Sequence, residues 1–151
     1  MEPLGIRNCN PLNIRRVAGT RWKGEIQTPQ ATLDGRGESQ TPVGGGAFCK
    51  FESMEWGIRA AFCLLRTYRD KYKLNCIADI IMRWAPPSEN HTAQYIRNVC
   101  RWTGFGGMQR LTETDWPALV RAMARQETGA ELDESVILAG FRLYRGSEIK
   151  N

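Results

Sequence analysis

A carboxyl group at the end of an apolar helical face is the feature of this sequence with the clearest chemical potential. Residues 114–129 predict one helix, because Thr114 suits the N-cap and a glycine ends the segment. One face of it carries an apolar stripe that ends in Glu127, after Trp116, Val120 and Met123. A carboxyl held against apolar side chains resists ionisation, as a general acid requires. Helical spacing does not fix burial, so a solvated carboxylate at a frayed helix end is the alternative.

The elements that must position this carboxyl are predicted to be a small β-rich part followed by helices. Segments 21–26 and 47–51 predict strands, with a loop or hairpin rich in glycine and proline between them. Apolar periodicity, capping residues and breakers then predict about five helices. They cover residues 54–72 after Ser53, residues 76–84, a segment capped by Ser88 or Asn90 and ended by Gly104, residues 114–129, and residues 132–144. The predicted fold class is therefore α+β, with the sheet segregated from the helices.

Length and composition indicate an ordinary globular chain. The 151 residues predict a single domain, 1–151, with a β-rich lobe at 1–51 and a helical lobe at 52–145. No apolar run is long enough to span a membrane, and the first residues do not resemble a secretory signal. We therefore expect synthesis in the bacterial cytoplasm, so action at a cell wall would need release or delivery as part of a virion. The net charge of +5 favours a polyanionic partner such as nucleic acid, an anionic membrane or an anionic cell wall.

Cysteine and histidine usage limits the chemistry further. The five cysteines are widely spaced without a C-x-x-C pair, which argues against a zinc ribbon and a disulfide framework. A single histidine, His91, makes a site with several histidine ligands impossible. No metal and no cofactor are expected.

Three segments share the pattern of a known group. They are RNCNPLNIR at 7–15 with WKG at 22–24, FCKFESMEWGIRA at 48–60, and IIMRWAPPSEN at 80–90. Together they resemble the phage and prophage proteins usually labelled "structural protein", which are grouped with the lytic endopeptidase of enveloped double-stranded RNA phages. The resemblance covers roughly residues 5–130. Since that group is considered lysozyme-like, it implies a cell-wall hydrolase fold encoded by a phage or prophage.

A weaker similarity implies a specific chemistry. Bacterial cell-wall N-acetylglucosaminidases show motifs similar to residues 10–15, 22–24 and 48–51, and to Trp84 with Tyr95. Their catalytic glutamate helix comes first in the chain and is missing from the front here. The segment QETG at 126–129 could supply it, which would make this chain a circular permutation of that arrangement. Pro11, Asn13 and Trp84 depart from the residues of that family.

This similarity implies a glycosidase mechanism with Glu127 as catalytic acid. Such a reaction also needs a second carboxylate or an acetamido group of the substrate. Glu25 in the predicted strand is the candidate for the second carboxylate, and Glu38 in the glycine-rich loop is the reserve. The alternative for Glu25 is an ordinary exposed strand residue.

Six further residues are candidate contacts for peptidoglycan, the expected partner of a monomeric enzyme. Trp22, Trp84 and Tyr95 offer flat faces for sugar rings, although Trp84 and Tyr95 suit a core equally well. Asn10, Asn13 and Asn90 offer hydrogen bonds to N-acetyl groups, although asparagines at such positions also cap turns and helices. Basic side chains could attract an anionic wall, or could simply be solvated: Arg15, Arg16, Arg21 and Lys23.

Two other functions stay open. An endopeptidase would use a cysteine nucleophile with His91, the one Cys/His pairing available. A non-enzymatic phage structural component would bind peptidoglycan or nucleic acid through its excess of basic residues, although nucleic acid is the less expected partner.

Overall fold

The computed structural model describes residues 2–26, 48–88 and 90–150. Its helices are α1 (Leu4–Arg7), α3 (Met54–Tyr72), α4 (Ile77–Trp84), α5 (Thr92–Thr103), the short 3-10 helix η1 (Glu113–Asp115), α6 (Trp116–Thr128) and α7 (Glu134–Lys150). No helix in these ranges is long and apolar enough to cross a membrane.

The predicted α+β class with an N-terminal β-hairpin is wrong. In the described part of the chain the backbone forms two isolated bridges, Arg15 with Phe48 and Glu25 with Phe51, and no strand. The segment expected as a strand at 21–26 is interrupted by a turn, in which the Glu25 amide donates to the Trp22 carbonyl and Gly24 has a φ of 79°. A turn within six residues leaves room for one paired residue only. Residues 2–26 and 48–51 of the lobe predicted to be β-rich therefore have isolated bridges as their only β-structure. Residue 47 of the second predicted strand segment and Glu38 both lie outside the described residues.

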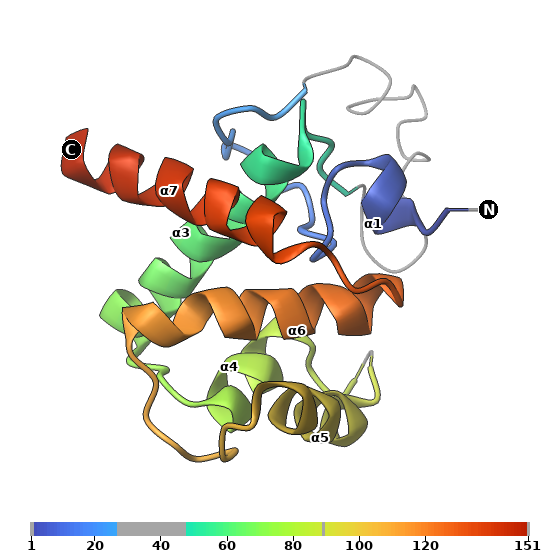
Figure 1. Ribbon diagram of the computed structural model, residues 1–151, viewed down its shortest axis with the longest axis vertical. Coiled ribbons are helices and arrows are strands. Elements are labelled where there is room, and N and C mark those ends of the chain that lie inside the picture. The colour runs from blue at the N-terminus through green and yellow to red at the C-terminus, as the bar shows by residue number, and fades with distance from the viewer. Residues whose placement is uncertain (1, 27–47, 89, 151) are drawn as a thin grey trace.

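Helix α6 lies in the middle of the molecule, with α7 on one side and α5 on the other (Figure 1). Its apolar stripe is buried as the periodicity predicted, with Trp116, Val120 and Met123 at 3% exposure or less. Helix α3 packs closely against α7, where the Phe62 ring contacts Phe141 edge to face. The helices therefore share one core, on which the N-terminal segment also packs through Leu12 and Ile14.

The ends of the helices follow the predicted signals only in part. Gly129, in a left-handed conformation, ends α6 as predicted. Thr114 is not the N-cap, because Thr112 and Asp115 form a capping box that starts η1 one turn ahead of α6. His91, rather than Ser88 or Asn90, occupies the N-cap position of α5. The short helix α1 was not predicted, because four residues carry no periodicity.

Candidate functional site

The carboxylate of Glu127 is held between the N-terminal segment and helix α5. Its side chain is partly buried in the last turn of α6. Asn13 Nδ2 donates to Oε1 at 2.9 Å, and the Tyr95 hydroxyl donates to Oε2 at 2.9 Å. Both carboxylate oxygens are therefore fixed by side chains that lie 114 and 32 residues away in the sequence.

Burial and hydrogen bonding act in opposite directions on this carboxyl. Loss of solvent raises the pKa of Glu127 above its usual value, while the donors Asn13 and Tyr95 and the positive charge of Arg15 lower it. The net pKa shift is upward. Burial, and then the charge of Glu127, raises the pKa of Tyr95 well above its usual value, so its hydroxyl keeps the proton that it donates. The site therefore contains a carboxyl that retains a proton at higher pH than an exposed glutamate does.

A rigid turn places Asn13 against this carboxyl. The buried Asn10 side chain donates to the carbonyls of Ile14 and Cys49 and accepts from the Ile14 amide, at 2.9 to 3.0 Å. Asn13 itself adopts a φ of 53°, and its amide donates to the Asn10 carbonyl. Asparagine tolerates this left-handed backbone better than most residues. Asn10 is thus a structural residue of the turn, and Asn13 is the one that faces Glu127.

A mostly apolar cavity of about 290 Å³ opens beside Asn13. Three aromatic side chains contribute to its wall, namely Trp22 from the N-terminal segment, Tyr68 from α3 and Trp84 from α4. The Tyr68 and Trp84 rings pack edge to face, with their centroids 5.8 Å apart. Flat apolar walls next to a polar amide suit a sugar ring, whose faces are apolar and whose rim is polar.

The structure brings together four of the predicted contact residues and the predicted catalytic Glu127. Asn13, Trp22 and Trp84 line the cavity, and Tyr95 reaches Glu127 from α5. Tyr68 and Leu64 from α3 also line the cavity and were not predicted as contacts. Arg15, expected to attract an anionic wall, lines the cavity as well.

Two other predicted residues lie elsewhere. Glu25 is 7% exposed rather than an exposed strand residue, and its Oε1 accepts the Trp22 amide at 3.0 Å. Burial, followed by the charge of this glutamate, raises the pKa of the neighbouring Cys49 thiol to about 12. Asn90 is exposed and donates to the Pro86 carbonyl at 3.3 Å. Glu25 and Asn90 therefore both stabilise local turns.

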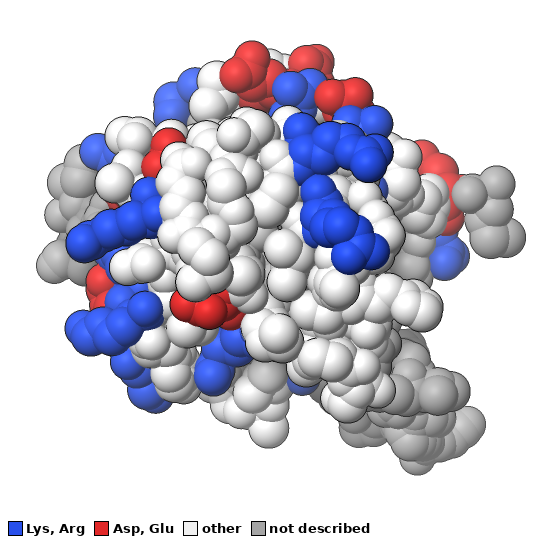
Figure 2. Space-filling view, turned by 90° about the horizontal axis from the view of Figure 1, so that it is seen from below, with Lys and Arg blue, Asp and Glu red and all other residues white. Residues whose placement is uncertain are grey.

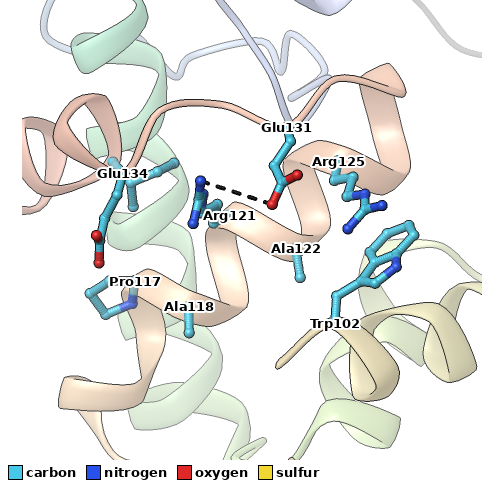
Figure 3. A pocket seen from close by; sticks show the side chains of 9 residues that line it. Trp102, Pro117, Ala118, Arg121, Ala122, Arg125, Glu131 and Glu134 are labelled. Carbon is cyan, nitrogen blue, oxygen red and sulfur yellow. Dashed lines mark ion pairs between the residues drawn. The ribbon is translucent and has the colours of Figure 1, made fainter. Parts of the chain in front are cut away.

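A second cavity, of about 170 Å³, lies between α5, α6 and α7 (Figure 3). Here the Arg125 guanidinium covers the Trp102 ring at 4.1 Å, and Arg121 pairs loosely with Glu131 at 3.9 Å. The positive charges at its wall are thus already engaged by an aromatic face and a carboxylate. None of the predicted site residues lines it.

The surroundings of His91 do not resemble a cysteine protease site. This exposed residue borders a cavity whose other lining residues include no cysteine: Thr92, Ala93, Gln94, Arg97 and Gln126. Burial raises the pKa of the Cys9, Cys76 and Cys100 thiols, which disfavours the nucleophilic thiolate. In the part of the chain that the structure describes, the cavity beside His91 therefore offers the endopeptidase alternative no cysteine.

No protein-family model matches the chain. Protein P5 of Pseudoalteromonas phage PM2 is 39% identical over 128 residues, which cover 83% of this chain and 71% of that protein. The chain belongs to the family of this phage protein. This agrees with the predicted relation to phage proteins, and the P5 name itself says nothing about catalysis.

Proposed function

We propose that this P5 relative is a peptidoglycan-degrading lytic enzyme of phage or prophage type, which cleaves the glycan strand with Glu127 as general acid. The observation that carries the proposal is the partly buried carboxyl of Glu127, with its raised pKa, joined through Asn13 to a cavity with aromatic walls. Membership of a phage protein family supports the phage origin in this proposal, and the resemblance to phage lytic proteins supports its lytic part.

The proposed mechanism assigns roles to few side chains. Glu127 gives its proton to the leaving glycosidic oxygen, while Trp22 and Trp84 hold a sugar ring in the cavity. The second catalytic group is not Glu25, because that carboxylate is buried and accepts a backbone amide. The acetamido group of the substrate is the better candidate, since it can stabilise the oxocarbenium-like state without a second protein carboxylate.

Purified protein incubated with peptidoglycan tests this proposal. New reducing ends indicate a glycosidase, whereas new amines indicate an endopeptidase. Glu127→Gln should lower the rate of reducing-end formation by about 100-fold or more, because general acid catalysis contributes about that much. The control Glu131→Gln changes an exposed carboxylate at the other cavity and should leave the rate unchanged. An unaltered rate in a folded Glu127→Gln protein would remove Glu127 from the mechanism.

One surface favours a second candidate, a non-enzymatic phage component that binds a polyanion. Met82 and Met108 are 49% and 74% exposed, and the hydrogen bond from Ala78 N to the Gly107 carbonyl holds their segments side by side. Figure 2, a view of the molecule from below, shows uncharged side chains in the middle and Lys and Arg groups on either side, with some Asp and Glu groups among them. Binding to peptidoglycan or DNA that weakens with salt, without new reducing ends or amines, would favour this candidate.

A further inference from the structure

Asn13 uses only one end of its side-chain amide. Nδ2 donates to Glu127, whereas Oδ1 is buried and has no hydrogen-bond partner within the described ranges. Buried acceptors are nearly always paired, because an unpaired one has lost its water without compensation. This oxygen therefore lacks a partner in the state that the structure shows.

The hydrogen bonds at Glu127 suit its ionised form. Both carboxylate oxygens accept, one from Asn13 and one from Tyr95. A protonated carboxyl carries an O–H donor, for which Nδ2 offers no acceptor. The Tyr95 oxygen could accept this hydrogen only if the Tyr95 hydroxyl stopped donating to Glu127. The hydroxyl is buried, so its own hydrogen would then lose its acceptor. The protonated acid thus lacks an acceptor, and Asn13 Oδ1 is an acceptor without a donor.

We propose that Asn13 is a proton-linked positioning residue, whose amide turns over when Glu127 takes up a proton, so that Oδ1 accepts the new O–H. The inference rests on the proposed function for its catalytic meaning. The proton comes from solvent, and no other bond forms or breaks. Rotation about the last side-chain bond of asparagine has a broad, two-fold energy profile, so both orientations of the amide are favourable conformations.

The space beside Gly5 accommodates the turned amide. A Cβ on Gly5 would lie 3.2 Å from Asn13 Oδ1 and 3.0 Å from the Asn10 carbonyl oxygen, so both oxygens border the same small space. An Nδ2 brought to this place would lie in the space that the Asn10 carbonyl oxygen also borders. The backbone of Asn13 stays where it is, because its amide bonds the Asn10 carbonyl at 2.9 Å.

Rotation of the Asn13 amide allows the site to stabilise both protonation states of Glu127. Arg15 and the donor Tyr95 favour the carboxylate, and burial favours the acid. If the Asn13 amide could not rotate, its N–H donor would stabilise only the carboxylate, as Arg15 and Tyr95 do. An amide that turns instead stabilises whichever form is present, which keeps the carboxyl in one position before and after it transfers its proton.

Nuclear magnetic resonance of the unmodified protein tests the inference without substrate. The Asn13 side-chain amide and the Glu127 carboxyl carbon are followed from about pH 4 to about pH 8, a range that includes the ordinary and raised glutamate values. We expect both sets of signals to change with the same midpoint. The amide of Asn98 donates to Gln126, the neighbour of Glu127 on α6, at 2.8 Å and serves as the control that should not follow this midpoint. Asn13 signals that stay constant while Glu127 titrates would overturn the inference.

Glu127→Gln supplies a second measurement, because its amide N–H imitates the O–H of the protonated acid. In this variant Asn13 should remain turned at every pH, and its signals should match those of the parent at low pH. Signals that match the parent at high pH would contradict the proposal. If the variant does not fold, the titration of the parent decides alone.

The outcome is independent of the enzymatic proposal. If the Asn13 signals follow the titration of Glu127 in a protein that leaves peptidoglycan intact, the proposed amide rotation stands and the proposed glycosidase activity is refuted. Glycan cleavage with an unresponsive Asn13 would retain the glycosidase and refute the amide turn.

Discussion

At the scale of single residues, the Tyr95 hydroxyl is one of the groups that oppose the rise in the pKa of Glu127 caused by burial. Tyr95→Phe removes the hydroxyl that donates to Oε2, so the pKa of Glu127 should rise and the pH profile of glycan cleavage should extend to higher pH. The free energy of unfolding should fall by about 1.5–3 kcal/mol where Glu127 is ionised, as for a hydrogen bond to a charged group. Urea unfolding and pH–rate profiles measure both effects. Tyr72→Phe, at a more exposed position, is the control, and a stability loss that is equal at low and high pH would contradict the assignment.

The raised pKa of Glu127 also predicts how stability depends on pH. The folded state binds this proton more tightly than the unfolded state, whose glutamate titrates near 4.5, so the contribution is complete below that value. It is lost as pH rises through the raised folded value, with a slope of at most about 1.4 kcal/mol per pH unit. Glu127→Gln removes the titration, so the stability of the variant relative to the parent should increase over this interval. Denaturant titrations at several pH values measure the difference, and a difference that falls with rising pH would show that the pKa is lowered.

The sequence predicted the position of a residue correctly where helical periodicity alone determined it. Spacing placed Glu127 at the end of the α6 stripe, and the structure buries that stripe and part of the glutamate side chain. Spacing does not say which side chain from elsewhere will meet it. Asn13 and Tyr95 were singled out through a resemblance, as contacts for substrate, and their hydrogen bonds to Glu127 were not predicted.

At the scale of elements, helices were predicted better than extended segments. Helices α3 and α4 begin and end within one residue of the predicted positions, because long apolar faces and breakers mark them. The expected strands failed because β-branched or aromatic residues next to a turn glycine do not specify a partner. One isolated bridge still joins the two expected segments, at Glu25 and Phe51, and the other joins Arg15 to Phe48.

The contact between α3 and α7 provides a test at this scale. A Cβ on Gly140 would lie 2.5 Å from Ile58 Cγ2 and 3.0 Å from the Glu55 carbonyl oxygen, so Gly140→Ala should push the two helices apart. We expect a loss of about 1–3 kcal/mol in the free energy of unfolding, as for overpacked cores. Gly146→Ala, in the same helix with nothing within 4 Å, should be neutral or stabilising by up to about 1 kcal/mol. Equal effects on denaturant midpoints would show that α7 does not pack on α3 in this way.

At the scale of the whole molecule, two of the cavities differ in how well they suit a glycan. Trp22 and Trp84 line the cavity beside Asn13, and Trp102 lines the one between α5, α6 and α7. The Trp102 ring is covered by Arg125, whereas the wall formed by the other two indoles is open and mostly apolar. An oligomer of N-acetylglucosamine should therefore enter the first cavity.

The five tryptophans of the chain report on this choice through their indole N–H signals. Addition of an N-acetylglucosamine tetramer should shift the signals of Trp22 and Trp84 and leave Trp102 and the buried Trp116 unchanged. Trp22→Ala should weaken binding about 5- to 150-fold, which corresponds to about 1–3 kcal/mol for the loss of one aromatic contact, while Trp102→Ala should bind as the parent does. Both variants are compared in the Glu127→Gln background, so that binding is measured without turnover. A shift confined to Trp102 would show that the glycan binds in the other cavity, which neither Asn13 nor Glu127 lines. That result would contradict the assignment of Glu127 as the proton donor.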